Sequence, residues 1–438
     1  MSTQERTEEA TALPKSRAEQ RNVRRTLVSG AVGTTIEWYD LYLYSSASAL
    51  IIGPVFFPSG SSLTGQLAVF GTFAAGFVAR PLGGLFFGHL GDRKGRKSAL
   101  VATMLLMGLA TFAIGLLPDY RQAGALAPIL LVALRVLQGI GIGGEWGGAV
   151  LLATENAPPG RQTLYSSWSA AGFPLGLLAS TSVFSFVDYI GTDGQPSWQW
   201  RLPFLSSLFL VGVGLFVRLR IKETPSFTEG GRHVARVPAL EALRSRPLPI
   251  LTGALVALGT GLIVTTFSVY LVAWAARQGP APGQSALHGL MIGAALECLL
   301  IPAWAALADR IGPHLVIFTG FVICAAAIVP AAGALSSGRL MDSALLFATA
   351  LGVGHAAVYG SLAGLLTRLF PSRHRYSGLA LTYQMGSTVA SAGPLVATAL
   401  VGDAQSIQPV VTLFLVVMAL AGAAVLITPS AHALAARR

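Results

Sequence analysis

Long apolar runs separated by short polar breaks fill most of the chain between Leu27 and Thr428. A helix needs about 20 apolar residues to cross the roughly 30 Å hydrocarbon core of a bilayer. Barrel strands would instead show alternating segments of about 10 residues. The pattern therefore predicts an all-α membrane protein with twelve transmembrane helices, at 27–55, 64–90, 98–118, 125–154, 163–187, 202–221, 249–276, 286–307, 314–335, 343–367, 376–401 and 408–428.

The composition supports a membrane protein and argues against an enzyme. Of the 438 residues, 53% are hydrophobic and only 11% are charged, whereas a soluble domain carries about 25% charged residues. The cysteines, Cys298 and Cys324, lie in apolar runs without metal-ligand spacing. Because no nucleophile–base grouping or phosphate-binding loop is visible, we expect neither catalysis nor a metal or cofactor.

The net charge of +11 could suggest a nucleic-acid partner, but the positions of the cations indicate membrane topology instead. Basic residues gather on alternate loops, as at 93–97 after the second run and 218–222 after the sixth. Loops on the other side carry few charges of mixed sign. By the positive-inside rule both termini are predicted to be cytoplasmic, in a bacterial inner membrane. The first 26 residues are polar, so we expect no cleavable signal peptide.

The connection at 222–248 is the longest cytoplasmic loop and divides the chain into two sets of six helices. It predicts a cytoplasmic tail at 1–26, bundles at 27–221 and 249–428, and a second tail at 429–438. A repeat supports the division, because the segment 92–95 (Asp-Arg-Lys-Gly) reappears at 309–312 as Asp-Arg-Ile-Gly. Two pseudo-symmetric bundles with a solute between them near the midplane are typical of transporters. We expect a monomer in the lipid bilayer.

Two acids interrupt the first apolar run. Glu37 and Asp40 lie one helical turn apart, although a charge at this depth costs about 2.5–3.5 kcal/mol on insertion scales. Two close carboxyls do not both ionise readily. We therefore predict that Asp40 takes a coupling proton, with Glu37 beside it; the alternative is that both acids pair with arginines and only stabilise the bundle.

The second and fourth runs contain arginines and a glycine-rich segment. Arg135, Gln138 and Glu145 fall on one side of the fourth helix, and Arg80 interrupts the second. The glycines between 139 and 148 predict close helix contacts. If all of them ionise, the three acids Glu37, Asp40 and Glu145 and the two arginines have a net charge of −1, which one proton would neutralise. We predict proton coupling at Glu145 and binding of an anionic solute at the arginines and Gln138; a closed ion-pair network is the alternative.

The second half has few intramembrane charges, namely Glu297 and His355. Glu297 is predicted to bind solute or a proton, with snorkelling to a helix end as the alternative, and His355 is more typical of packing. Further predicted substrate-binding residues are Tyr44, Tyr270, Tyr359 and Gln384.

The loop after the second run combines glycines, one acid and spaced cations. The positive charge of this loop predicts that it keeps the adjacent helix ends on the cytoplasmic side of the membrane. In addition, Asp92 could engage a facing helix N-terminus or an arginine in one transport state. The predicted gating residues are Gly88, Asp92, Arg93, Gly95, Arg96, Glu155, Arg161, Asp309 and Arg310.

Several of these motifs resemble those of known transporters. The segments 88–97 and 135–143 resemble signatures of the major facilitator superfamily. The chain is similar to its metabolite:proton symporter family, and to the shikimate permease subgroup in particular, at 37–40, 80–84, 143–148, 155–159, 164–167, 198–204 and 375–378. This resemblance implies proton-driven uptake and a polar site at Asp40, Arg80, Arg135 and Glu145. Family members carry shikimate, 2-oxoglutarate, citrate and proline or betaine.

The function expected from the sequence is thus proton-coupled symport of a small carboxylate or zwitterion by alternating access. Export or antiport of an endogenous solute uses the same fold and acids and remains an alternative. A solute receptor would need a longer cytoplasmic domain than these tails provide.

Overall fold

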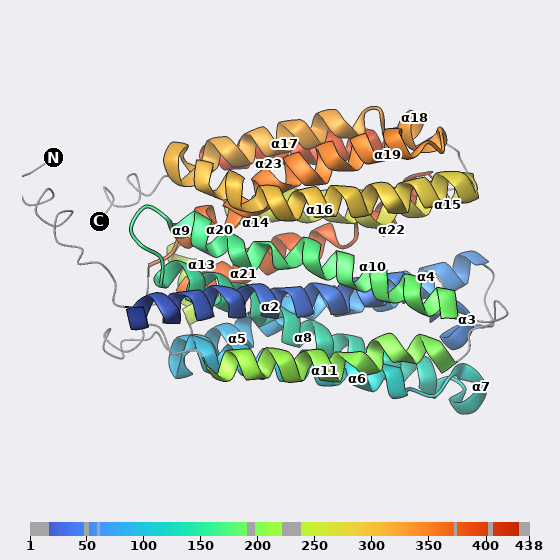
Figure 1. Ribbon diagram of the computed structural model, residues 1–438, viewed down its shortest axis with the longest axis horizontal. Coiled ribbons are helices and arrows are strands. Elements are labelled where there is room, and N and C mark those ends of the chain that lie inside the picture. The colour runs from blue at the N-terminus through green and yellow to red at the C-terminus, as the bar shows by residue number, and fades with distance from the viewer. Residues whose placement is uncertain are drawn as a thin grey trace, which may run out of the picture.

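The protein is described here by a computed structural model that covers residues 17–47, 52–58, 62–190, 198–220, 238–371, 375–401 and 406–428. The predicted tails lie largely outside these residues, as does most of the predicted inter-bundle loop. Every described element is helical (Figure 1).

The first half of the chain contains α2 (Arg17–Ala47), α3 (Gly53–Phe56), α4 (Ser62–Val78), α5 (Arg80–Lys94), α6 (Arg96–Leu116), α7 (Tyr120–Ala123), α8 (Leu126–Glu155), α9 (Gln162–Ala170), α10 (Gly172–Ile190), η2 (Trp198–Trp200) and α11 (Arg201–Leu219). The second half contains α13 (Pro238–Ser245), α14 (Pro247–Val264), η3 (Thr265–Tyr270), α15 (Leu271–Gln278), α16 (Pro280–Ile311), α17 (Pro313–Ile328), α18 (Ala331–Ser336), α19 (Leu340–Phe347), η4 (Ala348–His355), α20 (Ala356–Thr367), α21 (Arg375–Ala390), α22 (Gly393–Val401) and α23 (Gln408–Ile427).

Each predicted apolar run coincides with one or more of these helices, so the all-α membrane class is confirmed. Within the described residues, seven helical stretches are long and apolar enough to cross a membrane without interruption. Several other runs are divided by a turn, at Ala79, Ala171, Val329 and Ser391.

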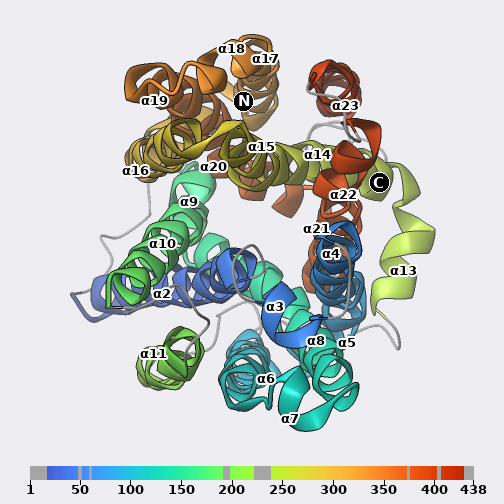
Figure 2. The ribbon, with the colours of Figure 1, turned by 90° about the vertical axis from the view of Figure 1, so that its right-hand side faces the viewer.

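The two halves face each other across the molecule (Figure 2). Helix α21 of the second half packs on α5 and α8, and α16 packs on α9 and α10. The main contacts between the halves are thus made by α5, α8, α9 and α10 of the first half and by α16, α20 and α21 of the second.

Proline explains the break in the second predicted run. Pro81 has no N–H to donate to the carbonyl of Phe77, four residues earlier. Thr388 of α21 donates to that carbonyl instead, at 3.1 Å. The break thus places a polar contact between the halves and starts a new helix, α5, at Arg80.

Glycines in α8 allow neighbouring backbones to approach closely, as the spacing predicts. A Cβ at Gly139 would collide with the carbonyl of Gly76, and one at Gly143 with the carbonyl of Arg80. Such contacts are typical of helix packing in membranes, where association depends on close van der Waals contact.

The internal repeat has a structural counterpart. Gly95 ends α5 at φ 98° and ψ 152°, and Gly312 ends α16 at φ 95° and ψ 144°. Both conformations are accessible to glycine and strained for other residues. The same sharp connection is therefore built twice, at the end of the molecule where α2 begins and α23 ends (Figure 1). We call this the basic end.

Candidate functional site

A cavity lies between the two halves, with about 40 Å³ open to the centres of water molecules. Its walls are mainly aromatic and aliphatic, and Arg80 and His355 add charge or polarity. The lining residues are Trp38, Leu41, Tyr42, Phe73, Phe77, Arg80, Phe173, Thr260, Gly261, Val264, Thr265, Val269, His355, Tyr359, Tyr383 and Ser387. An apolar pocket with a few convergent polar groups is typical of small-molecule sites.

Arg80 is the cation of this cavity. Its guanidinium carbon lies 3.8 Å from the centre of the Phe77 ring, and the side chain is 2% exposed. Among the described residues, it forms no ion pair within 4 Å and its Nε has no hydrogen-bond partner. A buried arginine in this state is suited to a planar anion such as a carboxylate.

Asp40 lies outside the cavity lining, at one end of a hydrogen-bonded chain. The Thr111 hydroxyl donates to Asp40 Oδ2 at 2.8 Å, and Gln138 Nε2 donates to the Thr111 oxygen at 2.7 Å. Gln138 Oε1 in turn accepts from Arg135. Asp40 is fully buried, and its Oδ1 has no partner among the described groups. The chain joins the predicted proton acceptor to the fourth-helix arginine without an ion pair.

Arg135 and Tyr44 are removed from the cavity wall. The Arg135 guanidinium carbon lies 3.8 Å from the centre of the Tyr44 ring, and the Tyr44 hydroxyl contacts the Thr72 hydroxyl at 2.5 Å. Glu37 is also buried, and its Oε2 is without a partner in the described part of the chain.

Glu145 has a cation that the sequence interpretation overlooked. Arg218 of α11 forms a buried ion pair with it and also donates to the Leu100 carbonyl. Thr103 donates to Glu145 Oε2 at 2.8 Å. The predicted net charge of −1 for the buried residues of the first half is therefore wrong, because including Arg218 makes their net charge zero. The sequence assigned Arg218 to the cytoplasmic loop because it lies at the end of an apolar run.

The second half contributes a carboxyl–imidazole pair. His355 Nδ1 lies 2.5 Å from Glu297 Oε1, and both side chains are fully buried. His355 lines the cavity, whereas Glu297 lies behind it and does not. Tyr359, also predicted, lines the cavity with its ring stacked on His355.

The remaining predicted substrate-binding residues lie elsewhere. Gln384 Nε2 donates to the Gly143 carbonyl at 3.0 Å and joins α21 to α8. Tyr270 is outside the lining as well. Sequence reasoning missed the aromatic wall formed by Trp38, Tyr42 and Phe173. The spacing of four between Trp38 and Tyr42 places them on one face of α2 and was the available signal.

The halves are joined between the cavity and the basic end. The rings of Trp146 and Tyr383 stack with centres 3.9 Å apart, and the Tyr376 hydroxyl donates to the Gly144 carbonyl at 2.6 Å. These contacts join α8 to α21.

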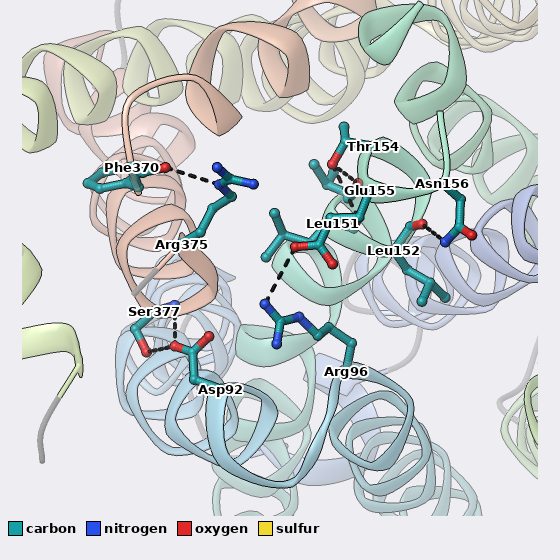
Figure 3. Close-up of polar contacts among 11 residues, drawn as sticks. Asp92, Arg96, Leu151, Leu152, Thr154, Glu155, Asn156, Phe370, Arg375 and Ser377 are labelled. Atoms are coloured by element: carbon teal, nitrogen blue, oxygen red, sulfur yellow. Dashed lines mark hydrogen bonds and ion pairs between the residues drawn. The ribbon is translucent and has the colours of Figure 1, made fainter. Parts of the chain in front are cut away.

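Two of the predicted gating acids hold helix N-termini of the opposite half. Asp92 accepts hydrogen bonds from the Ser377 hydroxyl at 2.8 Å and from its backbone N–H at 3.3 Å, in the first turn of α21 (Figure 3). Asp309 accepts from the N–H groups of Thr163 and Leu164 in the first turn of α9, at 3.0 and 2.9 Å. A carboxylate at a helix N-terminus is stabilised by the free N–H groups and by the helix dipole.

Two ion pairs lie beside these contacts. Arg96 lies 3.5 Å from Glu155 (Figure 3), and Arg368 lies 3.8 Å from Asp309. Asp92 lies beyond the predicted apolar run 64–90, in the last turn of α5. Burial raises its pKa to about 6, while the hydrogen bonds from Ser377 act in the opposite direction.

Gly88 and Gly95 contribute through their backbones. A Cβ at Gly88 would lie 3.1 Å from Ser377, so the absence of a side chain lets α5 approach α21. Gly95 ends α5 with positive φ, and Arg161 provides the N-cap position of α9. For Arg93 and Arg310, a role in gating stays a prediction.

Known proteins are similar to this chain over most of its length. The model of the family described as "Sugar (and other) transporter" matches residues 26–245. The shikimate transporter of Escherichia coli (strain K12) is 39% identical over 388 residues, which cover 86% of this chain and 88% of that protein. The proline/betaine transporter of the same organism is 30% identical over 421 residues, covering 91% and 82%.

A solved structure agrees with the fold. The partially occluded inward-open form of the xylose transporter XylE from E. coli superposes with a TM-score of 0.71 at 15% identity, covering 93% of this chain and 97% of XylE. At this identity the similarity concerns the fold alone.

Proposed function

Because the chain belongs to the sugar (and other) transporter family of the major facilitator superfamily, close to the shikimate transporter, we propose that it imports a small organic carboxylate together with a proton. The protein is a multi-pass membrane transporter and not an enzyme. What we propose is the class of the solute and the identity of the coupling ion.

The observation that carries the proposal is the state of Arg80. Its guanidinium is buried at the cavity between the halves, and among the described residues no carboxylate oxygen lies within 4 Å of it, although the buried Glu37 acts on it from a greater distance. A buried charge without a hydrogen-bonded partner is costly, and a solute carboxylate would supply that partner. The aromatic walls would pack against the apolar part of the same solute.

Proton coupling is proposed at Asp40, with Glu37 as its neighbour. Asp40 is fully buried, has one free carboxyl oxygen, and is joined through Thr111 and Gln138 to Arg135. Protonation of Asp40 would remove a buried negative charge and change the net charge of the hydrogen-bonded group that ends at Arg135. Glu145, held by Arg218, is proposed to stabilise the first bundle instead.

Alternating access is proposed to move residues 27–221 against residues 249–428, with 222–248 as the connection. The contacts of Asp92 and Asp309 would hold the basic end shut and break when it opens. We also propose that the basic end is cytoplasmic. A cysteine placed at Asp342, which is partly exposed in α19 at the opposite end, should then react with an impermeant thiol reagent added to intact cells, and one at Arg310 should not.

Uptake into proteoliposomes tests the function. Labelled shikimate, other carboxylates and betaines are offered with an imposed inward proton gradient, and the intact protein is compared with Asp40→Asn. Asp342→Asn, far from the cavity and paired with Arg339 on the surface, is the control. We expect accumulation that an uncoupler and Asp40→Asn both abolish. If no solute accumulates, or if the gradient has no effect, proton-driven import is wrong and efflux or exchange is tested next.

A further inference from the structure

The Glu297–His355 pair is a buried polar unit that proton coupling at Asp40 does not use. Glu297 lies near the middle of α16 and His355 ends the π-helical segment η4. Both side chains are 0% exposed. Ionisable residues inside a membrane protein are costly and usually mark a functional path or site.

The His355 ring is held in one orientation. Its Nδ1 contacts Glu297 Oε1 at 2.5 Å, the Tyr359 ring stacks on it with centres 5.3 Å apart, and the Phe173 ring packs at 5.2 Å. Because Nδ1 is engaged, Nε2 is the ring nitrogen that can serve a solute. Within the described residues Nε2 has no hydrogen-bond partner, although the ring lines the cavity.

The hydrogen bond to Glu297 determines what Nε2 can recognise. An ionised Glu297 accepts the proton on Nδ1, and the neutral imidazole then presents a lone pair at Nε2. A lone pair accepts a hydrogen bond from a hydroxyl group. The quaternary ammonium of a betaine has no N–H or O–H to donate.

Arg80 and His355 come from opposite halves and line the same cavity. A solute with a carboxylate and a hydroxyl could therefore contact both halves at once. The π-helical segments η3 and η4 both contribute lining residues, Thr265, Val269 and His355. Such segments are frequent at functional sites.

We propose that His355, oriented by Glu297, is the second half's recognition residue for a hydroxylated carboxylate: Nε2 accepts from a solute hydroxyl while Arg80 binds the carboxylate. Glu297 is a positioning residue. This inference rests on the proposed function, since it names the solute class of the same cavity.

Equilibrium binding to the purified full-length protein tests the inference without a proton gradient. The probes are shikimate, the same ring without hydroxyl groups (cyclohexene carboxylate), and glycine betaine. For the intact protein we expect shikimate to bind about 10-fold to 100-fold more tightly than cyclohexene carboxylate, because the analogue leaves a buried acceptor unpaired. Betaine should bind most weakly.

Four variants separate recognition from folding. His355→Phe keeps an aromatic ring and removes both nitrogens, and should lower the preference to about 1-fold to 3-fold by weakening shikimate binding alone. Glu297→Gln still accepts from Nδ1 and should keep most of the preference, whereas Glu297→Leu should lose it. His288→Ala, at an exposed position of α16, should match the intact protein.

The outcomes are distinct. If His355→Phe or Glu297→Leu fails to give a folded monodisperse protein, His355→Gln, whose amide oxygen can accept, is measured and should retain part of the preference. The inference is overturned if His355→Phe keeps the preference, if betaine binds more tightly than shikimate, or if the intact protein binds neither carboxylate. Intact selectivity without gradient-driven uptake would instead overturn only the proposed proton-coupled import.

Discussion

Replacing Arg218 with glutamine would leave the Glu145 carboxylate buried without its cation. Both side chains are at most 2% exposed, and the same guanidinium also donates to the Leu100 carbonyl. Breaking a buried ion pair by removing one partner costs about 3–5 kcal/mol, because the remaining charge is not solvated. We therefore expect Arg218→Gln to lower the free energy of unfolding by about that amount.

A double-mutant cycle identifies the cause. Glu145→Gln together with Arg218→Gln removes both charges, so the double variant should recover about 2 kcal/mol or more relative to Arg218→Gln alone. Denaturant unfolding in detergent micelles, followed by tryptophan fluorescence, measures each corner of the cycle. Additive losses would refute the view that the pair acts as one neutral unit.

Three further predictions follow from contacts between helices. Gly143→Val should destabilise the fold by about 1–3 kcal/mol, because the new side chain collides with the Arg80 carbonyl. Gly212→Val is the control, since Gly212 has open space around it and the substitution should not destabilise the fold. Thermal unfolding measures both variants. Thr388→Val should weaken the closed state of the basic end by about 1 kcal/mol, because Thr388 no longer donates a hydrogen bond to the Phe77 carbonyl of α4. Cysteines placed in the cavity should then be labelled faster from the basic end. Burial raises the pKa of Asp92 to about 6 when the basic end is closed, while solvation on opening returns it toward about 3.9. The closed form thus binds the proton more tightly, so its population should increase as the pH falls from about 7 to about 5, and Asp92→Asn should remove this dependence in spin-label distance measurements.

The pattern of apolar runs was sufficient to predict the fold class. A bilayer requires that each crossing segment satisfy its own backbone hydrogen bonds and reach a minimum length. Both requirements are local, so they can be read from the chain without knowing which helices are neighbours. The repeated glycines at 95 and 312 are a second local signal, since glycine adopts positive φ without the strain that a side chain would cause.

The partners of the polar residues could not be read in this way. Helical periodicity places Glu145 on a face of its own helix, but Arg218, 73 positions later, becomes its partner only when α11 packs against the same bundle. Similarly, the sequence suggested Glu297 for the cavity and packing for His355. The structure places His355 in the wall and Glu297 behind it.

The sequence by itself thus determined the helices, the repeat and the presence of costly buried charges. Only the tertiary structure decided which faces meet. The physical reason is that lipid tails are as apolar as leucine side chains, so hydropathy does not distinguish a lipid-facing position from a buried one. In α16, Leu299 is 73% exposed and Leu290 is 3% exposed, and the packing of the surrounding helices alone makes the difference.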